Sequence, residues 1–305
     1  MKREITYILE RLGQIFEQQY ADWQVVDLTT VGSGLDTLVC QARSAPFGPI
    51  AIKVPWYRWV STNNDPDVDA RELLQQEAVL STHLAAYHVA TPHVYALHQG
   101  DDDFDFLVSE FIAHDESKPD EYEFGALMRA IHASPPPQIS FVMQGTTPLH
   151  VTLAERLTRR LEVVTRLTGT PFNTRSAADI QAILEPANTR QSILHMDARP
   201  ENLLIYQGKI LAIIDWSNAL LGAPALDLAR IAEYGYLSPD FLRGYGNQHC
   251  FAHLPSAVEM LYRLDTATML TVVFLSENRN VERGKMQFER VSELYAAFEK
   301  ETSHE

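Results

Sequence analysis

Alternating apolar and polar residues predict a β-rich region in the first third of the chain. Charged residues interrupt the apolar ones over residues 1–16, and this pattern predicts an amphipathic helix before the first strand. Apolar positions at helical spacing predict one further helix over residues 70–87. The expected strands are 25–31, 38–42, 50–54, 94–98 and 106–110. The pattern therefore predicts a small lobe made of a sheet with one helix.

Helical periodicity dominates beyond residue 112. The expected helices are 124–133, 152–168, 177–184, 224–233, 239–245, 255–276 and 281–300. A short β island interrupts them, with expected strands at 193–195, 202–206 and 210–215 and a Gln207-Gly208 turn between the last two. The change from strands to helices predicts two lobes, residues 1–111 and residues 112–305.

The composition is that of a globular protein, with 46% hydrophobic and 21% charged residues. A formal charge of −15 argues against nucleic acid as the main partner, because phosphate binding needs clustered Lys and Arg. The longest apolar run, 269–275, is too short to span a membrane, so no membrane partner is expected. The charges in the first 16 residues leave no signal-peptide core.

The two cysteines, Cys40 and Cys250, lie far apart and outside any C-x-x-C pattern. They support neither a disulfide framework nor a zinc site. A reducing, cytoplasmic location is therefore expected. The sequence leaves the oligomeric state open.

The most informative motif is H-x-D-x-x-x-x-N, formed by His195, Asp197 and Asn202 and followed by Asp215. Phosphoryl transfer to a hydroxyl needs a carboxylate that accepts or orients the proton, and oxygen ligands that hold Mg²⁺ on the nucleotide phosphates. Asp197 is the candidate base, and Asn202 and Asp215 are the candidate metal ligands. Asn202 is expected to open one strand of a hairpin and Asp215 to close the other, at the same end.

Each of these two aspartates also has an ordinary structural interpretation. Asp197 could be a turn or cap aspartate, as most loop aspartates are. Asp215 ends the apolar run 210–214, where a carboxylate needs a cation or strong donors, and a metal ion satisfies that need.

Lys53 and Glu77 form a second constellation. Strand alternation puts Lys53 on the face opposite Ile50, Ile52 and Val54. Glu77 shares the apolar stripe of its helix, where an unpaired carboxylate is costly. An ion pair between them, with Lys53 also reaching nucleotide phosphates, explains both placements. The alternative is a surface lysine and an unrelated helix-edge glutamate.

A glycine-rich turn, Gly32-Ser33-Gly34, comes about twenty residues before Lys53. Glycines let the backbone approach phosphates closely and present N–H donors. Most G-x-G turns are ordinary turns, so the motif gains its value from the lysine that follows.

Together these residues resemble the protein-kinase-like fold and, more narrowly, the aminoglycoside phosphotransferase and choline kinase group. The resemblance covers nearly the whole chain. The matching segments are Val31 to Ala42, Ala51 to Lys53, Gln76 to Ala78, Leu107 to Ile112, Phe124 to His132, His195 to Ile205 and Ile213 to Arg230. The resemblance implies an α+β, two-lobed fold, with a small antiparallel sheet and one helix in the N-lobe and a larger, mostly helical C-lobe.

The resemblance also implies roles for single residues. The Gly32–Gly34 loop would cover the nucleotide, Lys53 and Glu77 would pair at its phosphates, and the backbone of Glu110 and Ile112 would meet the purine. ATP or GTP would bind there with Mg²⁺.

In the second lobe, Asp227 would brace the catalytic loop together with His195. Arg199 would touch the γ-phosphate, as a basic residue does in protein kinases. The alternative for Arg199 is a surface arginine that holds the loop.

Length separates the two kinds of kinase. Protein kinases need an activation segment of some tens of residues after the metal-binding aspartate, whereas Pro224 follows Asp215 within nine residues. A small hydroxylated substrate is therefore favoured over a peptide. The chain departs from the family pattern at Met196, Arg199 and Ala223, where the family commonly has Gly, His and Asp.

The function expected from these features is transfer of the γ-phosphate of ATP or GTP to a hydroxyl of a small molecule. The charge of −15 favours an amine-bearing acceptor such as an aminoglycoside, because acidic clefts concentrate cations. Choline, homoserine, a sugar or a macrolide remain alternatives, as does a nucleotide-binding pseudokinase. A metallohydrolase built on His83, His88, His93 and His98 matches no ligand motif.

Overall fold

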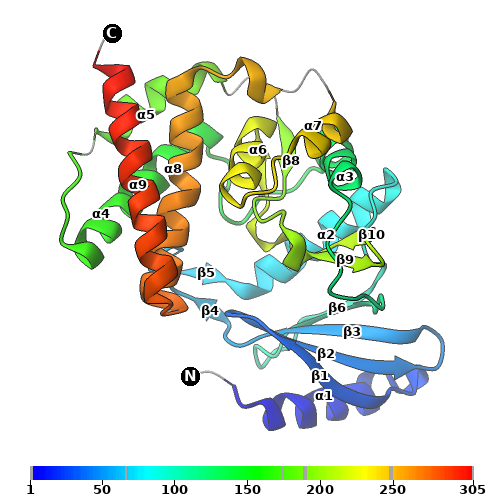
Figure 1. The fold of residues 1–305 in the computed structure, drawn as a ribbon. Helices are drawn as coiled ribbons and strands as arrows, with labels where there is room; N and C mark the ends of the chain where they lie inside the picture. Colours follow the sequence, from blue (N-terminus) through cyan, green and yellow to red (C-terminus); the bar gives the residue numbers. More distant parts are fainter. Residues whose placement is uncertain (1–2, 66, 174, 188–190, 247–249, 304–305) are drawn as a thin grey trace. The chain divides into compact units, whose positions relative to one another are not determined.

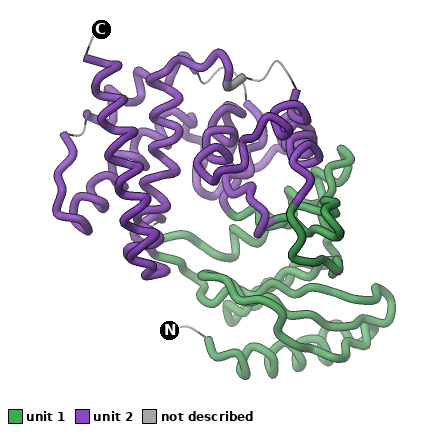
Figure 2. Tube along the Cα trace, in the orientation of Figure 1, with its two compact units in different colours: residues 1–61, 67–118, 203–217 green, residues 62–66, 119–202, 218–305 purple. Residues whose placement is uncertain are grey.

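A computed structural model describes residues 3–65, 67–173, 175–187, 191–246 and 250–303 of the chain (Figure 1). Met1 and Lys2, where the expected N-terminal helix begins, lie outside the described residues. Two compact units are present (Figure 2). Unit 1 contains residues 1–61, 67–118 and 203–217, and unit 2 contains residues 62–66, 119–202 and 218–305. The lobes predicted as 1–111 and 112–305 stay a prediction.

Unit 1 is built on a five-stranded sheet in the order β1-β2-β3-β7-β6. Every neighbouring pair in it is antiparallel. The strands are β1 Val26–Ser33, β2 Thr37–Ser44, β3 Gly48–Pro55, β6 Val94–His98 and β7 Phe106–Glu110. Helix α1, Ile5–Gln19, buries Ile8, Leu12, Ile15 and Phe16 in the same core as the apolar face of β3. This spacing of buried residues follows one face of a helix, so α1 covers one side of the sheet.

Helix α2, Ala70–Ala86, begins at Asp69, whose side chain accepts a hydrogen bond from the backbone N–H of Arg71. Its buried face includes Leu74, Glu77 and Leu80, so a carboxylate lies among apolar residues as the pattern indicated. A two-stranded hairpin, β9 Leu203–Tyr206 and β10 Lys209–Ile213, also belongs to unit 1. Its turn residues Gln207 and Gly208 both have positive φ, which suits the twist of a two-residue hairpin loop.

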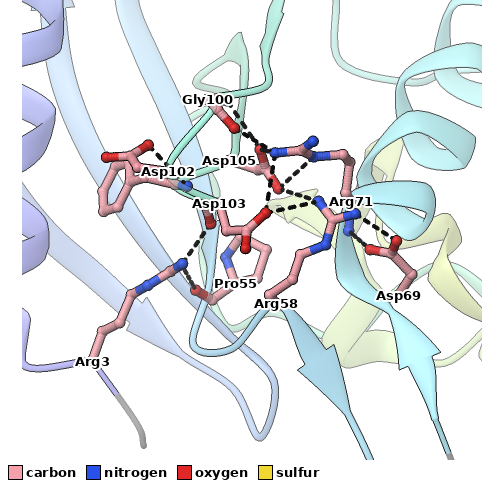
Figure 3. Close-up of polar contacts among 10 residues, drawn as sticks. Arg3, Pro55, Arg58, Asp69, Arg71, Gly100, Asp102, Asp103 and Asp105 are labelled. Atoms are coloured by element: carbon pink, nitrogen blue, oxygen red, sulfur yellow. Dashed lines mark hydrogen bonds and ion pairs between the residues drawn. The ribbon is translucent and has the colours of Figure 1, made fainter.

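An ion-pair network fixes the start of α2 to the sheet (Figure 3). Asp105, whose side chain is 3% exposed, accepts hydrogen bonds from Arg58 Nη1 at 3.0 Å and from Arg71 Nη2 at 2.8 Å. Arg58 also pairs with Asp69 at 2.6 Å, in the short hairpin of β4 Trp59–Val60 and β5 Val68–Asp69. The helix that carries Glu77 is thereby anchored at its N-terminus.

Unit 2 is mostly helical. Its α-helices are α3 Glu121–Ala133, α4 Leu149–Thr168, α5 Ala177–Leu184, α6 Pro224–Glu233, α7 Pro239–Tyr245, α8 Ser256–Val272 and α9 Val281–Thr302. Helices α8 and α9 lie side by side (Figure 1), and both contribute to a core shared with α4, α5 and α6. The expected helix 255–276 continues past α8 as a π-helical turn, Val273–Glu277. A short antiparallel pair consists of β8 Ser192–Leu194, which precedes the H-x-D-x-x-x-x-N motif, and β11 Leu220–Gly222, which follows Asp215.

Helices α3 and α7 meet at two glycines. A Cβ on Gly125 would lie 2.0 Å from the carbonyl oxygen of Phe241, and one on Gly244 would lie 2.0 Å from the carbonyl oxygen of Tyr122. Both positions therefore need glycine for the backbones to approach so closely. Within the described residues, no helix is both long and apolar enough to cross a bilayer.

Candidate active site

The H-x-D-x-x-x-x-N motif forms a compact loop of unit 2 after β8. The side-chain amide of Asn202 donates to the backbone carbonyl of Asp197 at 2.9 Å and to its Oδ2 at 2.8 Å. Asn202 ends a 3₁₀ turn, Pro200–Asn202, so β9 starts one residue later than expected. The spacing of five residues thus closes the loop on the candidate base.

Two further side chains hold the Asp197 carboxylate. Arg199 Nε lies 3.1 Å from Oδ1, and the Tyr234 hydroxyl donates to Oδ1 at 2.8 Å. Burial raises the pKa of Tyr234, so the phenol stays protonated and acts as the donor. No sequence pattern points to Tyr234, because it lies 37 residues from Asp197 and belongs to no motif.

Asp227 of α6 lies beneath this loop and is 1% exposed. Its Oδ2 accepts the backbone N–H of His195 at 2.7 Å, and its Oδ1 accepts that of Met196 at 2.8 Å. His132 Nε2 lies 3.0 Å from Oδ2. Although burial opposes ionisation, the hydrogen bond and charge of His132 hold the pKa of Asp227 below its usual range. Met196 has φ +64°, a left-handed conformation that these bonds help to hold.

In unit 1, Lys53 lies between two carboxylates. Its Nζ is 2.6 Å from Glu77 Oε2 on α2 and 2.9 Å from Asp215 Oδ1 beyond β10. The ion pair expected between Lys53 and Glu77 is therefore present. Although burial opposes the charge, Asp215 and Glu77 raise the pKa of Lys53, so the lysine is a cation.

Asp215 has a backbone that ends the strand. Its φ is +67°, so β10 stops at Ile213, two residues before the expected end. Leu203 pairs with Ile213 at this end of the hairpin, which is the end where Asn202 was expected to enter and Asp215 to leave. The Ser217 hydroxyl donates to Asp215 Oδ1 at 2.7 Å.

Helix α2 also holds the turn after Asp215. The Gln76 amide donates to the backbone carbonyls of Trp216 at 2.8 Å and Ser217 at 3.2 Å. Gln76 thus acts beside Glu77 on the same segment. Only the resemblance drew attention to Gln76, since a buried glutamine has no pattern that separates it from an exposed one.

The glycine-rich segment lies at the exposed end of β1. Gly32 and Ser33 belong to the strand, so the turn begins at Gly34, whose N–H donates to the carbonyl of Thr37 at 2.9 Å. A Cβ on Gly32 or Gly34 would meet no protein atom closer than 3.7 Å. Packing within the fold therefore does not explain why these positions are glycine.

The two residues expected to meet the purine are Glu110, the last residue of β7, and Ile112, two residues beyond it. The Glu110 N–H donates to the His93 carbonyl at 2.8 Å, and the Ile112 carbonyl lies 3.0 Å from His114 Nδ1. One backbone N–H and one backbone carbonyl of this segment thus have polar partners within unit 1.

Among the residues that the structure describes, no three His, Cys, Asp or Glu side chains converge into a cluster able to hold a metal ion. Two of the regularly spaced histidines, His93 and His98, make aromatic contacts, with Tyr95 and Phe106. A metal ion bound by the described residues would therefore need other kinds of ligand as well, such as an amide oxygen, phosphates and water.

Comparison with protein families decides the class of the protein. Residues 27–259 match the model of the phosphotransferase enzyme family. The chain belongs to this family. It is accordingly an enzyme that transfers phosphate to a hydroxyl group of a small molecule. Comparison with curated protein sequences gives no significant match.

Solved structures of phosphotransferases show the same fold at low identity. Aminoglycoside phosphotransferase APH(4)-Ia is 15% identical, with a TM-score of 0.66 over 96% of this chain and 99% of that one. A putative fructosamine-3-kinase from Haemophilus somnus 129PT is 15% identical, with a TM-score of 0.66 over 95% and 98%. Aminoglycoside phosphotransferase APH(2'')-Ib is 14% identical, with a TM-score of 0.59 over 98% and 99%. The expected kinase-like, α+β fold is thereby confirmed.

Proposed function

We propose that this phosphotransferase moves the γ-phosphate of ATP or GTP to a hydroxyl of a small acceptor, with Asp197 as the base. The observation that carries the proposal is Lys53, held between Glu77 and Asp215 from three separate segments of unit 1. A partly buried cation fixed by two carboxylates on different elements is a costly arrangement, and a site for nucleotide phosphates accounts for it.

The roles of the nucleotide-binding residues follow from their chemistry. Lys53 would contact the phosphates, and Glu77 would hold Lys53 in place. The Gly32–Gly34 segment would lie over the phosphates, where the absence of side chains at the two glycines lets the backbone N–H groups approach. The backbone of Glu110 and Ile112 would meet the purine.

Two oxygen donors suit Mg²⁺, which prefers carboxylate and amide oxygens. Asn202 donates to Asp197 through Nδ2, which leaves its amide oxygen for a metal, and Asp215 supplies a carboxylate. The ion would neutralise charge on the phosphates. The chemistry of each side chain therefore suits the role of a metal ligand.

In the second unit, Asp197 would accept the proton of the acceptor hydroxyl as the oxygen attacks the γ-phosphate. Tyr234 and Arg199 hold its carboxylate by hydrogen bonds and charge, and Asp227 holds the backbone on which it lies. Arg199 would also touch the transferred phosphate. Catalysis would thus depend mainly on positioning and charge neutralisation.

Structures of relatives support both nucleotides and a small acceptor. A variant of APH(4)-Ia is described as a ternary complex with AMP-PNP and hygromycin B, and aminoglycoside 2'-phosphotransferase-IIIa is described in complex with GDP. An amine-bearing acceptor such as an aminoglycoside is one candidate on this basis. A metabolic hydroxyl compound is the other, since the fold is shared with a putative fructosamine kinase.

The test is release of ADP or GDP with a panel of aminoglycosides, macrolides, choline, homoserine and sugars. Asp197→Asn is expected to reduce turnover by about 10² to 10⁴ while nucleotide binding persists. Asp240→Asn, an exposed aspartate of α7, is the matched control and should keep full turnover. Turnover near that of the wild type in Asp197→Asn would remove Asp197 from the mechanism.

Nucleotide binding is tested separately by thermal shift with AMP-PNP and Mg²⁺. Asp215→Ala is expected to abolish the metal-dependent part of this shift. An unchanged shift would contradict the assignment of Asp215. A clear shift with no release for any acceptor would favour the pseudokinase alternative.

A further inference from the structure

Unit 2 contains a cluster of buried arginines that the proposed chemistry does not use. Arg156 and Arg160 of α4 both bind Asp265 of α8, which is fully buried. Arg156 Nη2 lies 2.8 Å from Oδ2, and Arg160 Nη1 lies 2.9 Å from Oδ1. Arg160 also lies 3.5 Å from Asp65. These two arginines therefore have carboxylate partners.

A third arginine, Arg230 of α6, has none. It is 6% exposed, and within the described part of the chain no carboxylate oxygen lies within 4.0 Å of its guanidinium. Its Nε is buried without a hydrogen-bond partner, as is the Nε of Arg160. A buried cation without an ion pair is costly, so the Arg230 guanidinium calls for an anion that the described part of the protein does not supply.

Arg230 is nevertheless fully charged. Burial opposes its charge, but the carboxylates of Asp265 and Asp197 raise the pKa of Arg230. The positive charge is thus held by the field of the surrounding groups without any direct pair. That arrangement suits a residue whose partner arrives with a ligand.

The position of Arg230 ties this charge to the candidate base. The backbone N–H of Tyr234 donates to the Arg230 carbonyl at 3.0 Å, one turn along α6, and the Tyr234 hydroxyl donates to Asp197 Oδ1 at 2.8 Å. Arg199 lies against the same carboxylate, with its guanidinium 5.9 Å from the centre of the Tyr234 ring. The surroundings of Asp197 in unit 2 are therefore rich in cations and donors, although the whole chain carries a charge of −15.

We propose that Arg230, with Tyr234, binds an oxyanion of the acceptor, so that the substrate is a hydroxyl compound carrying a carboxylate or phosphate group. This inference rests on the proposed function, since it places the acceptor beside Asp197. It opposes the expectation of a polycationic acceptor such as an aminoglycoside, because the local charge next to Asp197 has the opposite sign to the overall charge. The shared chemistry of the two anions is a planar or tetrahedral set of oxygens, which a guanidinium binds through two N–H groups.

The first test compares acceptors that differ in one anionic group, using the wild-type enzyme with ATP or GTP. Homoserine is paired with 3-aminopropan-1-ol, glucuronate with glucose, and glycerol 3-phosphate with glycerol. The anionic member of at least one pair is expected to have a kcat/KM about 10- to 100-fold higher, the usual value of hydrogen bonds to a charged group. Glucuronate and glycerol 3-phosphate distinguish a carboxylate from a phosphate. Equal or better turnover of the neutral or amine-only members would overturn the inference.

The second test needs no turnover. The thermal unfolding midpoint is measured with inorganic phosphate against chloride at constant ionic strength. Phosphate is expected to raise the midpoint of the wild type and to lose most of that effect in Arg230→Met. Arg129→Met, which removes an exposed arginine of α3, should keep it. No phosphate effect in the wild type, or the same effect in Arg230→Met, would overturn the inference.

Arg230→Lys provides a second variant in case Arg230→Met does not fold. It keeps a cation but loses the two-pronged geometry, so the phosphate effect should fall by about threefold or more. The two proposals fail differently. A phosphate effect that depends on Arg230, without nucleotide turnover for any acceptor, would leave the oxyanion site standing and contradict the kinase activity. Turnover of amine-only acceptors, without turnover of anionic ones, would support the kinase activity and contradict the oxyanion site.

Discussion

Replacing Asp227 by asparagine tests how the catalytic loop is held. The substitution keeps the shape of the side chain but turns one carboxylate oxygen into an NH₂ group. Oδ2 faces two donors, His195 N–H and His132 Nε2, whereas Oδ1 faces only the N–H of Met196. The amide oxygen should therefore stay at the Oδ2 position, and the N–H of Met196 should lose its acceptor.

The size of the expected stability loss follows from the burial of the Asp227 side chain, which is 1% exposed. A hydrogen bond to a charged acceptor contributes about 1.5–3 kcal/mol. In the variant, the new side-chain NH₂ group also faces the N–H of Met196, and two donors that face each other repel. The free energy of unfolding is therefore expected to fall by about 3 kcal/mol. The same change releases a backbone with φ +64°, which costs about 1–2 kcal/mol to maintain for a residue with a side chain. Met196 should then relax toward negative φ and displace Asp197, the next residue.

The assay measures thermal unfolding and steady-state kinetics side by side. Asp227→Asn is expected to lower the unfolding midpoint by roughly 5 °C. It should also lower kcat by about 10²-fold, the usual consequence of displacing a reacting group by about 1 Å. The KM for nucleotide should change less than kcat, because Lys53, which would contact the phosphates, lies in unit 1, whereas the displaced Asp197 lies in unit 2. Asp240→Asn is the matched control. A variant with wild-type stability and kcat would show that Asp227 does not hold the loop.

Other substitutions test the packing of each unit by thermal or urea unfolding. Gly125→Ala places a Cβ 2.0 Å from the Phe241 carbonyl oxygen and should destabilise the protein by about 3 kcal/mol. The control is Gly13→Ala, in open space on α1, which should stabilise the protein by about 0.5–1 kcal/mol. Equal effects of the two substitutions would refute the close approach of α3 and α7. Asp105→Asn removes the charge between two arginines and should destabilise by about 2–4 kcal/mol, a value that a shift below about 0.5 kcal/mol would contradict. Ala223→Ser should stabilise by about 1 kcal/mol by supplying the side-chain cap that α6 lacks, and no gain would mean that the hydroxyl does not reach the first turn.

Elements with a clear period could be located from the sequence alone. The expected strands 94–98 and 106–110 coincide with β6 and β7, and the expected helices 177–184 and 224–233 coincide with α5 and α6. Their hydrophobic patterns are local, so neighbouring residues suffice to define them. Strand β8 was expected at 193–195, one residue late, whereas β4, β5 and β11 were missed, because two or three residues give no period to detect.

The candidate site divides in the same way. The Lys53–Glu77 pair could be predicted because each residue breaks the pattern of its own element, a lysine on a strand and a glutamate in an apolar stripe. Tyr234 and Arg230 break no pattern, since both lie near the C-terminal end of α6, where polar residues are ordinary. Their relation to Asp197 arises from tertiary packing that brings residues 37 positions apart into contact.

The departure at Met196 shows what the structure adds to a motif. Glycine, common in the family at this position, adopts a positive φ at no steric cost, whereas methionine at φ +64° is strained by about 1–2 kcal/mol. The Met196 side chain is 1% exposed and packs in the main core of unit 2 with Leu194 and Leu226. Burying a side chain of this size contributes about 2–3 kcal/mol, which offsets the strain. Packing thus allows methionine at a position where the loop geometry favours glycine. The backbone N–H groups of His195 and Met196 donate to the Asp227 carboxylate, and these two hydrogen bonds keep that geometry in place.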